Sequence, residues 1–139
     1  MRMRASVLWA FVADQFIIDR FGKYSIIGIW DGITASNFPA VHPLLFIVVG
    51  WKGDPLTTVM AETRIWTPAG TLLLTSGVHP MQLSPAGKGI DANQIMQTQF
   101  PQFGIYRIEL IGDGEVKHQF EISLMQAPQM MQGSTGVQN

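Results

Sequence analysis

Hydrophobic and polar positions along the chain form short runs, with turn residues separating them about every eight to twelve residues. β-branched and aromatic residues fill these runs, and no long segment repeats its apolar positions with the helical period of about 3.6. The pattern is typical of an antiparallel β-sandwich or barrel. It predicts strands at residues 6–12, 24–33, 44–51, 57–66, 71–75, 92–98, 104–111 and 115–124.

Two of these runs indicate how their strands are covered. Residues 44–49 are apolar at every position, so neither face can lie against water and the strand should be central or covered on both sides. Residues 57–66 alternate between apolar and polar side chains instead, which predicts one buried and one solvent-exposed face. The buried face carries Val59, Ala61, Thr63 and Ile65, and the wet face carries Glu62, Arg64 and Trp66.

The last two runs form a hairpin whose apolar positions all have even numbers. A two-residue turn at Asp113 and Gly114 would set apolar Leu110 opposite polar Lys117 and mismatch the faces. We therefore predict a three-residue loop at 112–114, with Gly114 at positive φ. The predicted pairs are Leu110 with Val116, Ile108 with His118, and Tyr106 with Phe120, which places His118 on the inner face.

A Gly-x-Tyr sequence, Gly104-Ile105-Tyr106, stands at the entry to this hairpin. In immunoglobulin-like sandwiches a tyrosine at this position returns its hydroxyl to the backbone and fixes a corner. The sequence thus favours an all-β, antiparallel, immunoglobulin-like sandwich of about seven to eight strands. The alternative is that Tyr106 is simply a core aromatic residue.

The length of 139 residues and mass of 15.4 kDa correspond to a single domain. We predict one β-sandwich domain over residues 1–124 and a flexible, uncharged tail of low complexity over residues 125–139. Arg2 and Arg4, followed by apolar residues 5–13, mimic a signal peptide, but a first strand explains this run better. No apolar stretch reaches the roughly 18–20 residues that a membrane-spanning helix needs, so no membrane association is expected.

The charged residues are few and scattered. The net charge is −1 and the nine Lys and Arg residues form no cluster, which argues against nucleic-acid binding. Cysteine is absent, so disulfides and thiolate metal sites are excluded. Only 14% of residues are charged against 47% hydrophobic, too little charge to cover a domain of this size. We therefore expect a homo-oligomer or a protein partner. Residues 44–49, Trp9 and Phe11 should contribute to the contact, unless the sandwich covers both faces of their strands internally.

Residues 22–31, Gly-Lys-Tyr-Ser-Ile-Ile-Gly-Ile-Trp-Asp, and residues 38–43, Phe-Pro-Ala-Val-His-Pro, carry a family resemblance. They are similar to bacterial proteins of about this length that are known as a domain of unknown function. The resemblance covers most of residues 5–124 and implies a small cytoplasmic β-sandwich. Trp30 stands where the family pattern has Phe. No activity comes with the family, so no role is transferred to His42 or Asp31.

Three histidines are the candidates for metal or proton chemistry, and none has a ligand spacing. The sequence Val-His-Pro occurs twice, at His42 and at His79. It most simply indicates a strand entry or a turn, because proline keeps the preceding residue extended. The alternative is that both imidazoles meet at one end of the sandwich and share a metal or an acidic ligand. Trp66 is the tryptophan expected on a wet face, where it could stack on a sugar.

No nucleophile elbow, phosphate-binding loop or dinucleotide motif occurs in the sequence. We therefore assign no catalytic residue, cofactor or metal site. Our first hypothesis is a non-catalytic interaction or assembly module. One alternative is a small-ligand or carbohydrate-binding module, with Trp66, His42 and His79 as possible ligand contacts. A second alternative is a metal-dependent enzyme that uses the two histidines.

Overall fold

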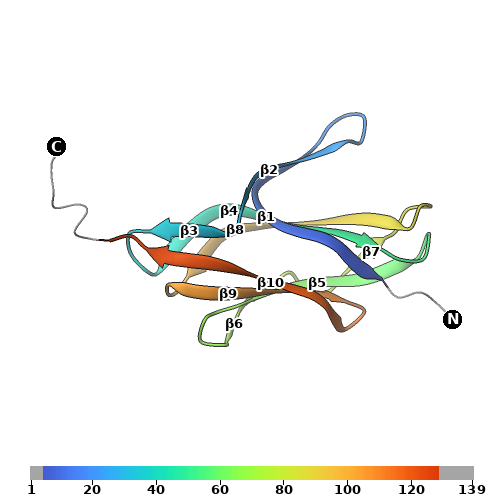
Figure 1. Ribbon diagram of the computed structural model, residues 1–139. Coiled ribbons are helices and arrows are strands. Elements are labelled where there is room, and N and C mark those ends of the chain that lie inside the picture. The colour runs from blue at the N-terminus through green and yellow to red at the C-terminus, as the bar shows by residue number, and fades with distance from the viewer. Residues whose placement is uncertain (1–4, 129–139) are drawn as a thin grey trace.

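The computed structural model describes residues 5–128, which form ten strands in two sheets and no helix (Figure 1). The all-β fold class is therefore confirmed, with more strands than the sequence predicted. Within these residues no helix is long and apolar enough to cross a membrane. The strands are β1 (Ser6–Ile18), β2 (Tyr24–Trp30), β3 (Gly32–Ala35), β4 (Ala40–Lys52), β5 (Thr58–Trp66), β6 (Leu72–Thr75), β7 (His79–Gln82), β8 (Lys88–Phe100), β9 (Gly104–Gly112) and β10 (Glu115–Gln126).

Sheet A has the strand order β2-β1-β4-β8 and is antiparallel throughout. β4 lies in its interior, as its unbroken apolar run predicted. Leu45, Ile47 and Val49 belong to the core between the sheets. Val48, which strand alternation places on the opposite face, is also fully buried. Both faces of β4 are therefore covered.

Sheet B has the order β3-β10-β9-β5-β6, and β7 also pairs with β5. β3 runs parallel to β10, so the prediction of a purely antiparallel sandwich is wrong at this edge. The run predicted as one strand at 24–33 divides at Asp31, where the chain leaves sheet A for sheet B. The backbone carbonyl of Asp31 accepts a hydrogen bond from the N–H of Ser123 in β10, which anchors this crossing.

The core fills the space between the two sheets. Its largest side chains are Trp51 of β4, Phe100 of β8 and Tyr106 of β9, each almost fully buried. The rings of Phe100 and Tyr106 meet edge to face at a centroid distance of 5.2 Å. Burying a large apolar side chain contributes about 1.5–3 kcal/mol, so these three residues hold the sheets together.

Tyr106 forms the predicted corner. Its hydroxyl donates to the carbonyl of Gln102 at 2.5 Å and accepts the Gln102 N–H at 3.2 Å. Burial raises the pKa of Tyr106, so the hydroxyl remains a donor at neutral pH. The corner is compatible with an immunoglobulin-like sandwich.

The last hairpin differs from its prediction. Gly112 pairs with Glu115, so the turn has two residues, and Asp113 and Gly114 both take positive φ, 50° and 82°. A register shift between Val116 and His118 then brings the even-numbered apolar residues of the two strands opposite each other. A β-bulge, rather than a longer loop, therefore aligns the apolar faces. His118 follows the even positions of the inner face, but it lies at the exposed hairpin end, where its ring stacks on that of Phe120 at 6.3 Å. The observed pairs are His118 with Leu110, Phe120 with Ile108, and Ile122 with Tyr106.

Several boundaries also move. β7 was not predicted, β1 extends six residues beyond Val12, and β10 runs to Gln126, past the domain boundary predicted at residue 124. Arg2 and Arg4, and the part of the predicted tail from residue 129 onward, lie outside the described residues.

Candidate functional site

β1 and β2 extend past the rest of sheet A as a two-stranded hairpin. The pairing of β1 with β4 ends at Ala13, whereas its pairing with β2 continues to the pair Ile18 and Tyr24. Figure 1 shows this hairpin rising from the body of the sandwich. We call residues 14–29 the arm.

Asp19 builds the tip of the arm. Its carboxylate accepts the backbone N–H of Phe21 at 2.8 Å and that of Lys23 at 3.0 Å. Its own N–H donates to the carbonyl of Lys23 at 2.7 Å, and Gly22 takes a φ of 82°. Asp19 is therefore the residue that closes this turn, and the arm ends in a well-formed turn.

The arm is apolar on both of its faces. Phe16 pairs with Ile26, and Ile17 and Ile27 lie on the opposite face. A two-stranded hairpin is only marginally stable in water by itself, so an apolar one needs a cover. The large apolar side chains that it exposes, at 45% to 73%, are Ile17, Ile18, Phe21, Tyr24, Ile27 and Ile29.

Aromatic side chains continue this apolar surface onto the outer face of sheet A. Trp9 lies over Gly50, where an added Cβ would come within 2.3 Å of the indole ring. The Trp9 ring stacks on Phe11 at 5.7 Å and approaches Tyr24 at 6.3 Å. Tyr24 in turn stacks on Phe16 at 6.1 Å, so aromatic contacts connect the sheet to the arm.

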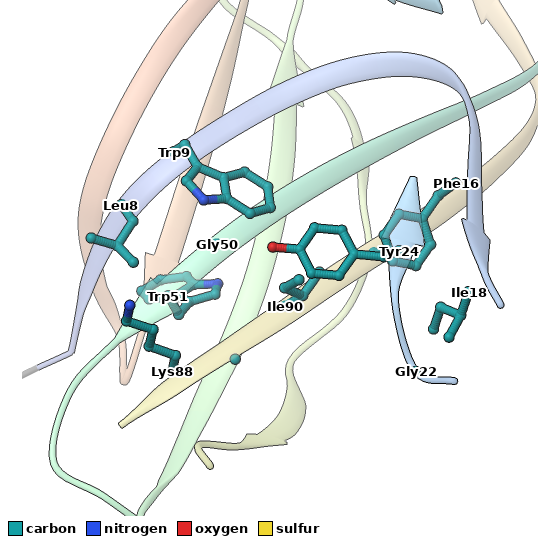
Figure 2. Close-up of a pocket in the computed structure, with 12 residues that line it drawn as sticks. Leu8, Trp9, Phe16, Ile18, Gly22, Tyr24, Gly50, Trp51, Lys88 and Ile90 are labelled. Carbon is teal, nitrogen blue, oxygen red and sulfur yellow. The ribbon is translucent and has the colours of Figure 1, made fainter. Parts of the chain in front are cut away.

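A cavity of about 640 Å³ opens between the arm and the outer face of sheet A (Figure 2). We call it the aromatic cavity. Trp9, Phe16 and Tyr24 are among its lining side chains, and among the described residues that line it Lys88 alone is charged. Its volume lies within the range of about 300–1,000 Å³ that small-molecule sites occupy. The remaining lining residues are Leu8, Ile18, Gly22, Gly50, Trp51, Gly89, Ile90 and Ala92.

Trp66, the tryptophan selected from the sequence, lies elsewhere. It is half-buried in β5 of sheet B, its indole N–H donates to Glu109 at 2.7 Å, and the Arg107 guanidinium lies 5.5 Å from its ring. These partners hold the ring and cover part of its face. Trp9 was missed as a candidate ligand contact, although its apolar strand was expected in an interface.

The structure does not bring His42 and His79 together. His42 is in β4, opposite Thr98 of β8, and its ring lies 5.5 Å from that of Trp30. His79 is in β7 and contacts Asp91, which is seven positions from Thr98 along β8. At about 3.3 Å per residue the two imidazoles are roughly 20 Å apart. A metal shared by both is therefore not possible in this fold.

His79 joins the two sheets through its ring. Its Nδ1 lies 2.9 Å from the carbonyl oxygen of Gly77, and its Nε2 lies 2.8 Å from the carboxylate of Asp91 in sheet A. Both partners are acceptors, so both contacts are hydrogen bonds only when the ring is protonated. Burial opposes this charge, but the two bonds and the nearby carboxylates of Asp91 and Glu62 outweigh it and raise the pKa of His79.

Buried polar side chains extend this contact into a network. Asn93 donates to the Ile47 carbonyl at 3.1 Å, and Thr63 and Asp91 lie within 3.3 Å of the same amide nitrogen. On β5, Glu62 accepts Arg64 at 2.8 Å and Thr75 at 2.6 Å. The hydrogen bond from Arg64, then that from Thr75, lowers the pKa of Glu62 despite its burial. The bonds of Asn93 satisfy polar groups between the sheets. Those of Glu62 do the same on the opposite face of β5, and both are structural tasks.

Metal chemistry finds little support in these groups. Within residues 5–128 no group of three or more His, Cys, Asp or Glu side chains is arranged to hold a metal ion. Both ring nitrogens of His79 already face acceptors, so a metal would have to displace one of these contacts.

A family of unknown function, DUF6941, matches residues 8–125. The chain belongs to this family. The match covers β1 to β10 almost completely, and so includes the arm and the aromatic cavity of this DUF6941 chain. Among curated proteins none matches it.

Solved structures show the same fold in larger proteins. The DUF6941 chain is similar to the alkylpurine DNA glycosylase AlkC from Pseudomonas fluorescens, with a TM-score of 0.57 and 9% identity. It is also similar to β-D-glucoside glucohydrolase from Trichoderma reesei (0.54, 12%) and to β-glucosidase from Listeria innocua in complex with glucose (0.53, 7%). The alignments cover 87–88% of this chain but only 30%, 19% and 16% of those chains. At these identities the similarity shows the fold alone.

Proposed function

We propose that this DUF6941 chain is a non-catalytic assembly module whose copies associate through the arm and the outer face of sheet A. The observation that carries the proposal is the exposure of six large apolar side chains on the arm. Contiguous apolar surface of this kind on a soluble protein usually marks an interface. The cytoplasmic location implied by the family resemblance is part of this proposal.

The energetics favour a contact that uses the whole arm. A large side chain that is half exposed gains about 1 kcal/mol when its remaining surface is buried, so two arms gain on the order of 10 kcal/mol. Association costs an estimated 4–15 kcal/mol in lost translational and rotational freedom. One or two exposed side chains would not meet this cost, whereas the gain from the full set falls within its range.

The mass of the protein in solution tests the proposal. Light scattering coupled to size exclusion at tens of micromolar chain should give a multiple of 15.4 kDa. Ile18→Lys should lower that mass, because Ile18 lies in the arm and is 63% exposed. Val78→Lys is the matched control, since Val78 is 62% exposed but lies outside the arm and sheet A. A soluble wild-type monomer of 15.4 kDa would overturn the proposal.

A small-ligand-binding module is the second candidate, and the aromatic cavity supports it. Trp9 could stack on a planar or pyranose ring there. Titration with glucose and with anilinonaphthalenesulfonate, followed by tryptophan fluorescence, tests this function. A saturable change that Trp9→Phe removes would support it, and no change with either probe would count against it. A metal-dependent enzyme has less support, because His42 and His79 lie far apart.

A further inference from the structure

We propose that two copies of the chain join by antiparallel pairing of their β2 strands, centred on Ile27, to give a two-fold symmetric dimer. This inference rests on the proposed assembly function and names the partner and the geometry of its contact. It starts from the free edges of the sheets. A free edge presents unpaired N–H and C=O groups, which a second strand can satisfy.

Most edges of this sandwich are protected against such pairing. Edge strands in soluble proteins are commonly short, charged, interrupted by proline or kinked. β3, β6 and β7 each have four residues, and β7 contains Pro80. β8, the other edge of sheet A, carries the charged residue Asp91, which points inward to His79.

β2 has little of this protection. Its seven residues include no charged residue and no proline. Gly28 takes a φ of 70°, but it has no side chain that would block an approaching strand. Five of the seven residues are exposed, although the strand is rich in isoleucine and ends in Trp30. β2 is therefore the edge best suited to accept another strand among residues 5–128.

Self-pairing of β2 also matches charges. Full overlap of the strand with a second copy places Ile27 opposite itself and Tyr24 opposite Trp30 of the second copy. The same register sets Lys23 opposite Asp31 of the second copy, and symmetry repeats this pair. Both side chains are exposed in the single chain. A register that fully pairs the strand thus also joins opposite charges at both ends.

The area available agrees with a dimer. Three of the six exposed apolar side chains, Tyr24, Ile27 and Ile29, lie on β2 at the contact itself, and the other three lie on β1 and the turn beside it. Together they present on the order of 600 Å² per copy, if each contributes about 100 Å². A standard specific interface buries roughly 800 Å² per partner. The strand backbones and the flanking charged residues supply the remainder.

A single cysteine tests the geometry without interference, because the chain has no cysteine of its own. Residues opposite each other in antiparallel strands have Cα atoms about 4.5–5.5 Å apart, within the range that a disulfide spans. Ile27→Cys should therefore form a disulfide-linked dimer in air at tens of micromolar chain. Met96→Cys is the control, since Met96 is 65% exposed on β8, the opposite edge of sheet A.

Charge exchange tests the register. Lys23→Glu and Asp31→Lys should each raise the dissociation constant of the dimer, roughly threefold to tenfold at low salt, because two surface ion pairs become repulsive contacts. The double variant exchanges both charges and should restore the wild-type constant. Loss of pairing in both single variants with no rescue in the double variant would contradict the register.

The outcomes separate this inference from the function on which it rests. A dimer that cross-links through Ile27→Cys but not through Met96→Cys supports β2 pairing. A dimer that fails to cross-link at Ile27→Cys, or that cross-links through Met96→Cys, overturns the inference and leaves the assembly function standing. A wild-type monomer overturns both.

Discussion

The imidazole of His79 should make the folded protein less stable as the pH rises above the ordinary pKa of histidine. When the ring loses its proton, one of its two contacts, to Gly77 or to Asp91, ceases to be a hydrogen bond. Hydrogen bonds to charged groups contribute roughly 1.5–3 kcal/mol. The side chain is 31% exposed, so solvent screens part of this energy and we expect a loss of about 1–2 kcal/mol.

The direction of the effect follows from the raised pKa of His79. The stabilisation is complete below the unfolded-state value of about 6.5 and disappears as the pH rises through the folded-state pKa. Thermal unfolding by circular dichroism from about pH 5.5 to about pH 9 should show a loss of roughly 4–8 °C. His79→Gln cannot bind the proton and serves as the reference. A constant difference between wild type and this variant across the range would refute a protonated His79.

Three further predictions concern the fold and the outer face of sheet A. Tyr106→Phe should lower the free energy of unfolding by about 1 kcal/mol, as measured by denaturant unfolding, because the bonds to Gln102 are lost; an unchanged value would mean that the corner contributes nothing. Gly114→Ala should cost about 1 kcal/mol at its positive φ, measured in the same way, and no change would argue against the observed turn. Gly50→Ala should displace Trp9 and shift tryptophan fluorescence to the red, while an identical spectrum would contradict their contact.

Much of the fold could be predicted because it depends on local pattern. The apolar run in β4 identified an interior strand, and the Gly-x-Tyr sequence identified the corner at Tyr106. β7 was missed because it is only four residues long and includes Pro80, so its alternation is too short to detect. The extension of β1 was missed because Asp14 and Gln15 resemble the start of a turn. Only the pairing with β2 shows that the strand continues through them.

The last hairpin shows a limit of register arguments. The even numbering of its apolar positions correctly indicated that these residues lie opposite each other. A bulge after Val116 aligns them as well as a longer loop does. The three-residue loop predicts a milder effect for Gly112→Ala than for Gly114→Ala, and the structure reverses this order. A Cβ at Gly112 would lie 2.9 Å from the buried ring of Trp51, so the substitution should be costly.

The candidate site could be predicted only in part. The low fraction of charged residues and the apolar first strand pointed to an interface that includes Trp9 and Phe11. Both residues lie on the outer face of sheet A. Alternation within β5 singled out Trp66, but its partners Glu109 and Arg107 come from β9, which no local pattern relates to it. The arm itself depends on where the pairing of β1 with β4 stops, a long-range feature that sequence periodicity does not contain.

Hydrogen exchange of the arm tests the central claim most directly, because it reports whether these residues are covered in solution. Followed by mass spectrometry at tens of micromolar chain, peptides that span residues 14–30 should exchange slowly, and their exchange should accelerate on dilution to the monomer. Peptides from β5 and β9, in the interior of sheet B, should be unaffected by dilution. Rapid exchange throughout the arm at every concentration would contradict an assembly built on this surface.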